Sequence, residues 1–219
     1  MNVYVIVGDA PLYEKTFLIV KEDKAIVVDP GVAGKTVLSA CDELGATPIA
    51  VLLTHGHADH ILGAKALQEA GIPLYAHAEE FEVITGRENL ALVLGRKIPS
   101  FTPDFAVQDG NEPDLSPFGV KVLFTPGHTK GSVCYLIDGA LFSGDTLFAG
   151  SYGRADFPTG DLQDLVCSIA NELFELPSET PVYCGHGCEM PTVIGEAIPA
   201  FPDTTIGREY STNPILDLL

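Results

Sequence analysis

Residue types that bind metal ions are concentrated in one short run of the sequence, Thr54-His55-Gly56-His57-Ala58-Asp59-His60. Only six histidines occur in the 219 residues, and three of them lie in this run. Imidazole nitrogen and carboxylate oxygen are the usual protein ligands of zinc and similar divalent ions. In an extended segment His55 and His57 project to the same side, whereas Asp59 and His60 fall at the start of the following helix. The spacing therefore predicts that His55 and His57 bind one ion and that Asp59 and His60 bind a second.

Three further residues of the same types each follow a predicted strand. His128 stands in a Pro-Gly turn, Asp145 follows Ser143-Gly144, and His186 has glycine on both sides. A single histidine is usually structural, but three such residues with the same placement, added to the run, indicate one shared metal site. The sixth histidine, His77, has neither glycine nor proline beside it, and we expect it to be structural.

The elements that must position these residues follow from the apolar pattern. Apolar and β-branched runs predict strands over 3–7, 16–20, 25–29, 49–53, 74–76, 120–124, 132–137, 140–143 and 181–184. We expect helices over 34–44, 61–70, 79–93 with a break near Gly86, and 161–174, and loops over the proline-rich residues 95–118. Each half of the chain thus has strands, a strand end with metal-ligand types, and a helix. This predicts one α/β domain over residues 1–219, with two sheets face to face, helices outside, and a site at their shared edge.

Composition limits the location and the partners. Hydrophobic residues make up 46% of the chain and charged residues 19%, which is typical of a globular protein. The net charge of −18 disfavours nucleic acid and membrane surfaces as partners, and we expect a small-molecule substrate. Asp9 interrupts the N-terminal apolar residues and no basic segment precedes them, so we expect no signal peptide. The five cysteines contain no CxxC pair, and we expect reduced thiols in a cytoplasmic protein.

The complete set of motifs resembles the metallo-β-lactamase fold superfamily. The motifs are His55-Gly56-His57-Ala58-Asp59-His60, Pro126-Gly127-His128-Thr129, Gly144-Asp145 and Gly185-His186-Gly187, and the resemblance extends from Asp29-Pro30-Gly31 to the end. It implies an αβ/βα sandwich of two mixed sheets with helices on the outer faces. It also implies a first metal site of His55, His57 and His128, a second of Asp59, His60 and His186, and Asp145 as a bridge between them.

Within that superfamily, residues 143–157 resemble the glyoxalase-II-like (hydroxyacylglutathione hydrolase-like) enzymes, particularly the short ones. Zinc β-lactamases of the common type carry a cysteine at the second site, where this chain has Asp145. Only about 33 residues follow His186, too few for the helical extension that holds glutathione in longer glyoxalase II enzymes. The resemblance therefore implies hydrolysis of a thioester or related ester by a hydroxide that bridges two divalent ions. We expect zinc, with iron or manganese as alternatives, and Asp59 as the catalytic residue that orients the hydroxide.

Several assignments stay open at this point. Arg154 is the best candidate for binding a substrate carboxylate, and the alternative is a salt bridge with Asp156 or Asp161. Asp29 and Thr54 are candidates to hydrogen-bond the ligating histidines. The alternative functions are a persulfide dioxygenase-like enzyme with one iron and a non-enzymatic, metal-stabilised binding module. The oligomeric state is open.

One motif occurs twice near the C-terminus. Residues 192–196 read Thr-Val-Ile-Gly-Glu and residues 205–209 read Thr-Ile-Gly-Arg-Glu, before Asn213-Pro214. Short relatives have a single Thr-Ile-Gly-x-Glu run, so this chain contains an insertion of about a dozen residues. The sequence does not decide which copy takes the family position.

Overall fold

The first sheet is mixed and has seven strands. It is seen in a computed structural model, which describes residues 1–187 and 193–219. The strand order is β13-β1-β2-β3-β4-β5-β6; β13, β1, β2 and β3 pair antiparallel, and β3 to β6 pair parallel. The strands are β1 (Asn2–Val7), β2 (Lys15–Lys21), β3 (Lys24–Val28), β4 (Thr47–Leu52), β5 (Leu74–His77), β6 (Phe105–Val107) and β13 (Ala197–Pro199).

The second sheet is also mixed and has five strands in the order β14-β12-β9-β8-β7. Only the β12–β9 pair is parallel. A separate two-stranded hairpin, β10–β11, follows β9. The strands are β7 (Val120–Phe124), β8 (Val133–Ile137), β9 (Ala140–Gly144), β10 (Leu147–Phe148), β11 (Ser151–Tyr152), β12 (Pro181–Cys184) and β14 (Thr204–Thr205).

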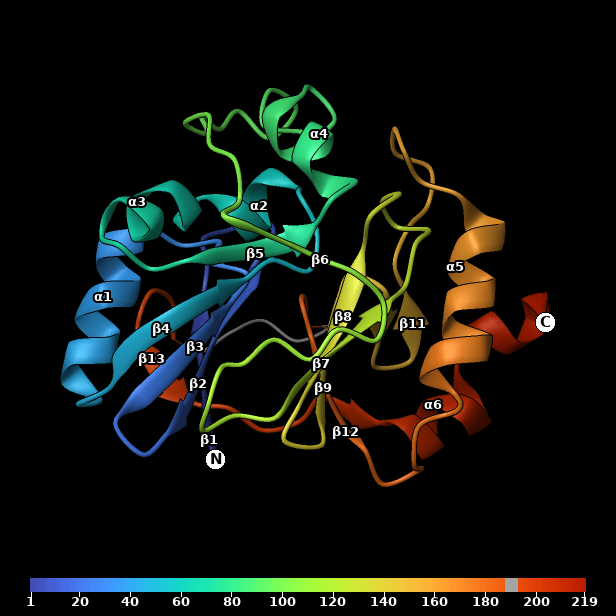
Figure 1. Cartoon of the computed structure of the whole chain (residues 1–219). Helices are drawn as coiled ribbons and strands as arrows, with labels where there is room; N and C mark the ends of the chain where they lie inside the picture. Colours follow the sequence, from blue (N-terminus) through green and yellow to red (C-terminus); the bar gives the residue numbers. More distant parts are fainter. Residues whose placement is uncertain (188–192) are drawn as a thin grey trace.

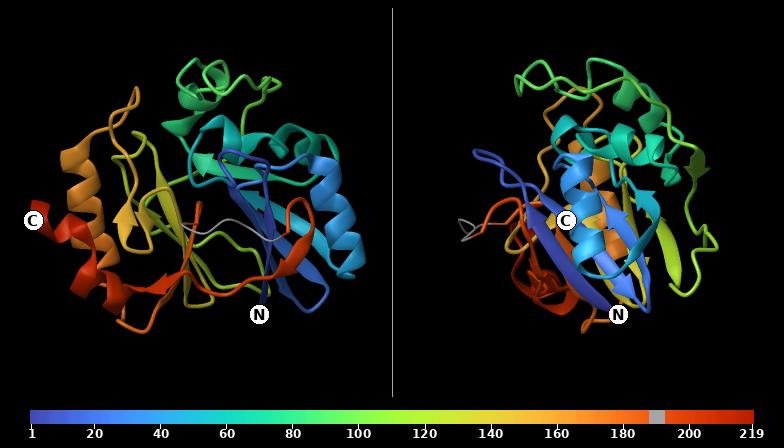
Figure 2. Two further views of the ribbon diagram at one scale, coloured as in Figure 1. Left: turned by 180° about the vertical axis from the view of Figure 1, so that it is seen from behind. Right: turned by 90° about the vertical axis from the view of Figure 1, so that its left-hand side faces the viewer.

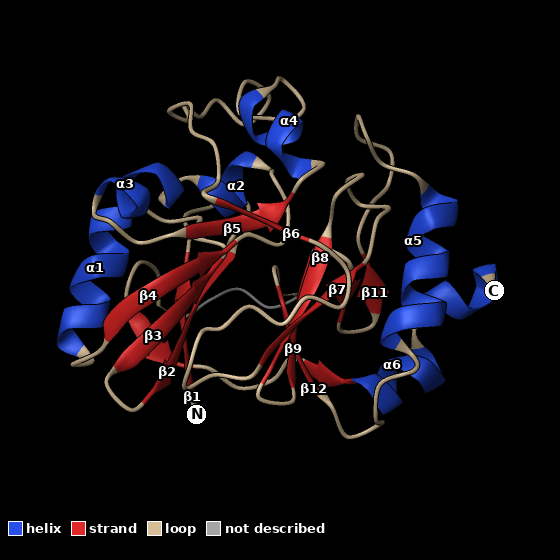
Figure 3. Cartoon of the chain, viewed as in Figure 1, coloured by secondary structure: helices blue, strands red, loops and turns tan. Residues whose placement is uncertain are grey.

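Helices cover the outer faces of both sheets (Figures 1 and 2). In the view coloured by secondary structure, α1 and α3 lie beyond the first sheet and α5 and α6 beyond the second (Figure 3). The helices are α1 (Gly34–Glu43), α2 (Ala58–Ile61), α3 (Ala64–Glu69), α4 (Glu80–Thr85), α5 (Leu162–Ser168), the π-helix η1 (Ile169–Leu173), α6 (Ile206–Thr212) and the 3-10 helix η2 (Pro214–Leu218). The predicted αβ/βα sandwich is confirmed.

Aromatic side chains join the two sheets at their inner faces. Phe17 on β2 contacts Phe142 on β9 edge-on, with ring centroids 5.4 Å apart, and Phe142 stacks on Tyr183 of β12 at 5.0 Å. These three rings belong to one buried apolar cluster between the sheets, and two further clusters lie under the helices. The inner cluster fixes the separation of the sheets and therefore the position of the strand ends that carry the candidate ligands.

The predicted helices at 61–70 and 79–93 differ from the structure. The first is two short helices, α2 and α3, because the backbone N–H of Gly63 donates to the carbonyl of Pro30 instead of continuing the helix. The second stops at Thr85, and residues 87–94 form turns built around Asn89, whose side chain donates to the carbonyl of Ile84. The segment 95–118, predicted to be loops, contains the short strand β6.

The two copies of the duplicated motif, residues 192–196 and 205–209, differ in the burial of their glutamates. The second copy begins α6, and Glu209 is fully buried there. Its carboxylate accepts hydrogen bonds from the Gly150 N–H at 2.9 Å and from the Asn213 side chain at 2.7 Å. Thr192 of the first copy lies outside the described residues, and Glu196 is exposed. The second copy therefore makes the structural contacts that hold the β10–β11 hairpin.

We propose that residues 1–219 form a single domain, because one buried apolar cluster joins the two sheets.

Replacing Phe142 by alanine should destabilise that domain by about 3–5 kcal/mol, because it removes the ring that contacts both Phe17 and Tyr183. Denaturant unfolding of the metal-free protein should show one transition with a lower midpoint. The control is Phe201→Ala, since Phe201 is 84% exposed and its loss should change stability by about 0.5 kcal/mol or less. Equal effects of the two changes, or two separate transitions, would contradict this account of the core.

Candidate metal centre

Four segments that follow strand ends bring the seven predicted ligands to one edge of the sandwich. The run at 55–60 follows β4, His128 follows β7, Asp145 follows β9 and His186 follows β12. These strands belong to both sheets, so the cluster lies where the two sheets share an edge. That the seven residues bind metal stays a prediction, but the fold brings all of them together.

His55, His57 and His128 form the first group. One ring nitrogen from each lies within 4.8 Å of the others, and all three side chains are buried. The Nε2 atoms of His55 and His57 are buried and have no hydrogen-bond partner. Buried polar atoms nearly always have a partner, so these two nitrogens are oriented for a ligand that the protein atoms do not supply.

Asp59, His60 and His186 form the second group, with donor atoms again within 4.8 Å of one another. Asp145 lies between the groups. Its Oδ1 is 3.4 Å from the Nε2 of His60, and its Oδ2 is 3.6 Å from the Nε2 of His128 and 3.4 Å from that of His186. One carboxylate thus faces histidines of both groups, which is the geometry that a bridging ligand requires.

The other ring nitrogen of four histidines is held from outside the cluster. Nδ1 of His55 lies 3.0 Å from the Thr54 hydroxyl, and Nδ1 of His60 lies 3.0 Å from the Asp29 carboxylate. Nδ1 of His128 and Nδ1 of His186 hydrogen-bond the backbone carbonyls of Arg154 and Leu12, at 2.7 and 2.9 Å. Such contacts fix the ring orientation of metal-ligating histidines and leave the opposite nitrogen directed at the ion.

The Asp29 carboxylate hydrogen-bonds both Thr54, which precedes the first ligand group, and His60 of the second group. Besides His60, its carboxylate accepts from the Thr54 backbone N–H at 2.7 Å and from the Thr54 hydroxyl at 2.6 Å. Thr54 in turn contacts His55. The hydrogen bonds predicted for Asp29 and Thr54 are therefore confirmed, and they connect the end of β3 to both ligand groups.

Glu80 is a buried carboxylate that sequence reasoning did not select. It is fully buried at the start of α4, and its Oε2 accepts from the Gly56 N–H at 2.6 Å. Its Oε1 accepts from the Thr129 hydroxyl at 2.7 Å and from the Gly131 N–H at 2.9 Å. Gly56 lies between His55 and His57, and Thr129 follows His128, so Glu80 connects the two segments that carry the first group.

Two glycines allow this connection. A Cβ on Gly56 would lie 2.9 Å from Oε2 of Glu80, and one on Gly131 would lie 2.8 Å from Oε1. Any larger residue at either position would displace the carboxylate. Glycine near a metal-ligand run, paired with an acidic residue after the next strand, is the only sequence signal for Glu80, and it is too common to be specific.

The electrostatics of the cluster favour a cation. Burial lowers the pKa of His57 to about 3, so its ring is neutral at pH 7 and one ring nitrogen keeps a lone pair that can bind a metal ion. Burial also works against the charged form of His186, but the carboxylates of Asp145 and Asp59 outweigh it and raise the pKa of His186 to about 10. Burial would raise the pKa of Asp145, yet His186 and His60 hold it well below its usual range. Two carboxylates and five imidazoles gathered in a largely buried space fit a pair of divalent ions.

A pocket of about 370 Å³ opens onto both groups. Its lining includes His57, Asp59, His128, Asp145 and His186, and the remainder is Leu12, Leu90, Leu94, Phe148, Ser151, Tyr152, Arg154 and Phe157. Arg154 lies in this lining, as expected, but its guanidinium donates two hydrogen bonds to Asp156 at 2.6 and 2.7 Å. The salt bridge considered as its alternative is therefore present, and substrate binding by Arg154 stays a prediction.

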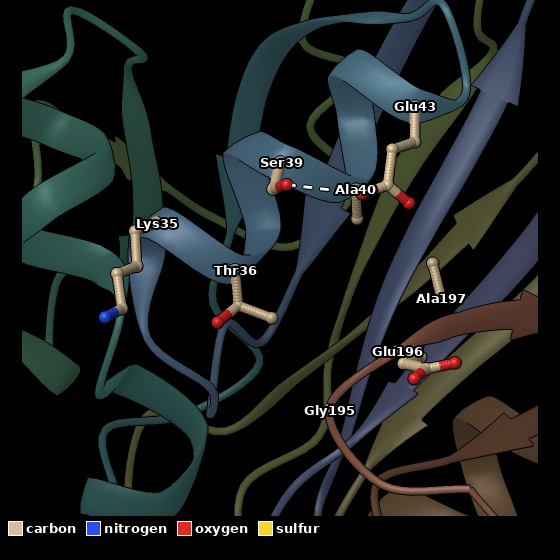
Figure 4. Close-up of a pocket in the computed structure, with 8 residues that line it drawn as sticks. All are labelled: Lys35, Thr36, Ser39, Ala40, Glu43, Gly195, Glu196 and Ala197. Atoms are coloured by element: carbon tan, nitrogen blue, oxygen red, sulfur yellow. Dashed lines mark hydrogen bonds between the residues drawn. The ribbon is translucent and has the colours of Figure 1, made fainter.

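A second hollow lies between α1 and residues 195–197, with Lys35, Ser39, Glu43 and Glu196 among its lining residues (Figure 4). Its described lining residues include no histidine and no aspartate, and Ser39 hydrogen-bonds Glu43 within it. Among those described residues nothing resembles a metal or catalytic site.

The described cysteines lie outside the ligand set. Cys184 is buried, and burial raises the pKa of its thiol, so it is unreactive; Cys188 lies outside the described residues. His77, expected to be structural, stacks on Phe124 with ring centroids 4.4 Å apart and is not among the seven clustered residues.

Replacing Glu80 by glutamine should weaken metal binding about ten- to a hundredfold, because an amide cannot accept from all three donors. Competition with a chromogenic chelator measures the affinity, and far-UV circular dichroism checks the fold. Glu82→Gln is the matched control, since Glu82 lies on the same helix but is exposed and pairs with Lys130. Unchanged affinity in a folded Glu80→Gln protein would show that the carboxylate does not position the ligands.

Comparisons with known proteins agree with this geometry. The model of the metallo-beta-lactamase superfamily matches residues 10–186. The chain is 32% identical to the "Probable metallo-hydrolase YqgX" of Bacillus subtilis, over 94% of each chain. It is also 32% identical to the "Hydroxyacylglutathione hydrolase GloC" of Haemophilus influenzae, over 90% of this chain and 89% of the relative.

Solved structures with similar folds point to the same family. A crystal structure of the BLEG-1 B3 metallo-beta-lactamase is similar with a TM-score of 0.84 at 32% identity, over 97% of this chain and 99% of that one. A crystal structure of TTHA1623 in a di-iron-bound form has a TM-score of 0.80 at 34% identity, over 95% of this chain and 98% of that one. None of the helices within residues 1–187 and 193–219 has the length and hydropathy needed to cross a membrane. With its sandwich of two sheets and its cluster of histidines and aspartates, this chain belongs to the metallo-β-lactamase superfamily.

Proposed function

We propose that this chain is a two-metal hydrolase that cleaves a thioester or related ester of a small molecule. The observation that carries the proposal is the pair of donor groups that share Asp145 and face one pocket. The similarity to a relative named hydroxyacylglutathione hydrolase supports the thioester class. A similar protein is named a B3 metallo-β-lactamase, so a β-lactam belongs among the substrates to be tested.

The proposed ligands divide as the two groups do. His55, His57 and His128 would hold one ion, Asp59, His60 and His186 would hold the other, and Asp145 would touch both. Two divalent ions bound there would polarise a substrate carbonyl and lower the pKa of water from about 15.7 toward about 7. We propose zinc, while the di-iron form of a similar protein keeps iron open.

Asp59 is the residue proposed to orient the attacking water. Its carboxylate lines the pocket and lies 3.5 Å from the Nε2 of His186. Burial would raise the pKa of Asp59, but His60 and His186 hold it below its usual value. It is therefore an anion at neutral pH and can accept a hydrogen bond, or a proton, from water in the pocket.

The leaving group of a thioester needs no separate acid in this pocket. A thiol has a pKa of about 8.5, so thiolate departs without being protonated first. Amide hydrolysis releases a far more basic nitrogen and requires a proton donor. This difference favours thioesters and activated esters over amides as substrates.

The test is a metal analysis with a parallel activity screen of the same preparation. We expect about two ions per chain and hydrolysis of S-lactoylglutathione or of simple thioesters, lost on chelation and restored by zinc. One iron per chain with oxygen uptake on glutathione persulfide would support the dioxygenase alternative instead. Full metal occupancy without turnover of any thioester, ester or β-lactam would support a binding module.

Replacing Asp59 by alanine should lower kcat by about a hundredfold or more, while the free energy of unfolding changes by about 1 kcal/mol or less. The physical reason is that the change removes the pocket carboxylate but leaves the core intact. Asp42→Asn, on the exposed side of α1, is the control that should keep full activity. If Asp59→Ala remained active, the proposed two-metal mechanism would be wrong.

A further inference from the structure

The pocket beside the metal centre has apolar walls. Five of its lining side chains are leucine or phenylalanine, and they come from four segments of the chain. Leu12 lies in the β1–β2 loop, Leu90 and Leu94 in the turns after α4, Phe148 on β10, and Phe157 in the loop before α5. The space enclosed by these walls is about 370 Å³. A chemical group that enters it must be small and would contact mostly apolar side-chain atoms.

The apolar walls flank both donor groups. The ring of Phe157 packs edge-on against His57, with centroids 5.7 Å apart. The ring of Phe148 packs edge-on against His186, with centroids 6.2 Å apart. One aromatic wall residue thus lies beside a histidine of each donor group.

The described lining offers a substrate carboxylate no lysine or arginine that is free of an ion pair. Arg154 is its only lysine or arginine, and both hydrogen bonds to Asp156 engage its guanidinium. The same guanidinium lies 4.0 Å from the centre of the Phe157 ring. The chain as a whole carries a net charge of −18, which further disfavours an anionic group here.

The walls are held in place by hydrogen bonds from the rest of the fold. The turn that carries Leu90 is fixed by the Ala58 N–H, which donates to the carbonyl of Asn89 at 2.8 Å. The hairpin that carries Phe148 is fixed by Glu209 and by Asn213, whose side chain donates to the carbonyl of Ser151 at 2.8 Å. These hydrogen bonds thus hold two of the segments that form the walls.

We propose that these walls form a subsite for an uncharged, apolar acyl group next to the scissile bond, aliphatic or aromatic. The inference rests on the proposed hydrolase function for its reaction, and it adds the substrate class. A terminal carboxylate on the acyl chain would be buried against leucine and phenylalanine without a partner, which is strongly unfavourable. An alkyl or aryl chain of the same length would instead remove apolar surface from water.

The test compares two thioesters of N-acetylcysteamine that differ only at the end of the acyl chain. Hexanoyl ends in a methyl group and adipoyl in a carboxylate, and both contain six carbons. We expect kcat/KM of the metal-loaded enzyme to be at least about tenfold higher for hexanoyl. Equal or higher kcat/KM for adipoyl would overturn the proposal.

A change in the wall should move this preference. Leu94→Lys places a cation in the subsite and should raise the adipoyl-to-hexanoyl ratio of kcat/KM about tenfold or more. Leu92→Lys is the matched control, because Leu92 lies two residues away on the same turn and is 80% exposed. The same shift in both variants would mean that net charge, and not the subsite, sets the preference.

Binding without turnover separates this inference from the proposed function. Calorimetry of the metal-loaded protein should show at least about tenfold tighter binding of hexanohydroxamate than of adipic monohydroxamate. If that difference appears but no thioester is hydrolysed, the subsite stands and the proposed reaction fails. If thioesters are hydrolysed but the hydroxamates bind equally, the subsite is wrong and the reaction stands.

Discussion

Five imidazole rings and two carboxylates crowd into the space between the ends of two sheets, and most of their atoms are shielded from water. Without a cation, the arrangement leaves buried nitrogens of His55 and His57 without partners and a carboxylate oxygen of Asp145 in the same condition. Burying such groups is costly unless they are paired. The other contacts of the site hold these side chains in the positions that the proposed pair of ions would require.

The holding contacts come from residues that never face the pocket. Asp29 binds the backbone and hydroxyl of Thr54 and the ring of His60, and Glu80 binds the backbone beside His57 and the hydroxyl beside His128. Both carboxylates are buried, and their oxygens accept hydrogen bonds from groups in or next to the segments that carry the candidate ligands. Hydrogen bonds to a charged acceptor offset its desolvation and make the segments rigid. Preorganisation of the donors is therefore a property of the whole edge and not of the histidines alone.

The sequence pointed to the seven candidate ligands because they are local signals: four of them lie within six positions, and the other three follow strand ends beside glycine. It predicted the layers because continuous apolar runs mark strands buried on both faces. It could not identify Glu80, whose partner Gly131 is 51 residues away and becomes its neighbour only in the folded chain. The prediction of one helix over 79–93 was wrong for a related reason. The side chain of Asn89 donates a hydrogen bond to the carbonyl of Ile84 at the end of α4, and the carbonyl of Asn89 accepts one from the N–H of Ala58, which lies in another segment. The apolar wall at Leu90 and Leu94 is a product of that same turn.

We propose that the two donor groups bind two ions bridged by Asp145. Anomalous diffraction from crystals of the metal-loaded protein, collected on both sides of the metal absorption edge, would locate these ions. We expect two peaks, one among His55, His57 and His128 and one among Asp59, His60 and His186, with Asp145 in contact with both. A single peak at full metal loading, or two peaks that Asp145 does not join, would contradict it.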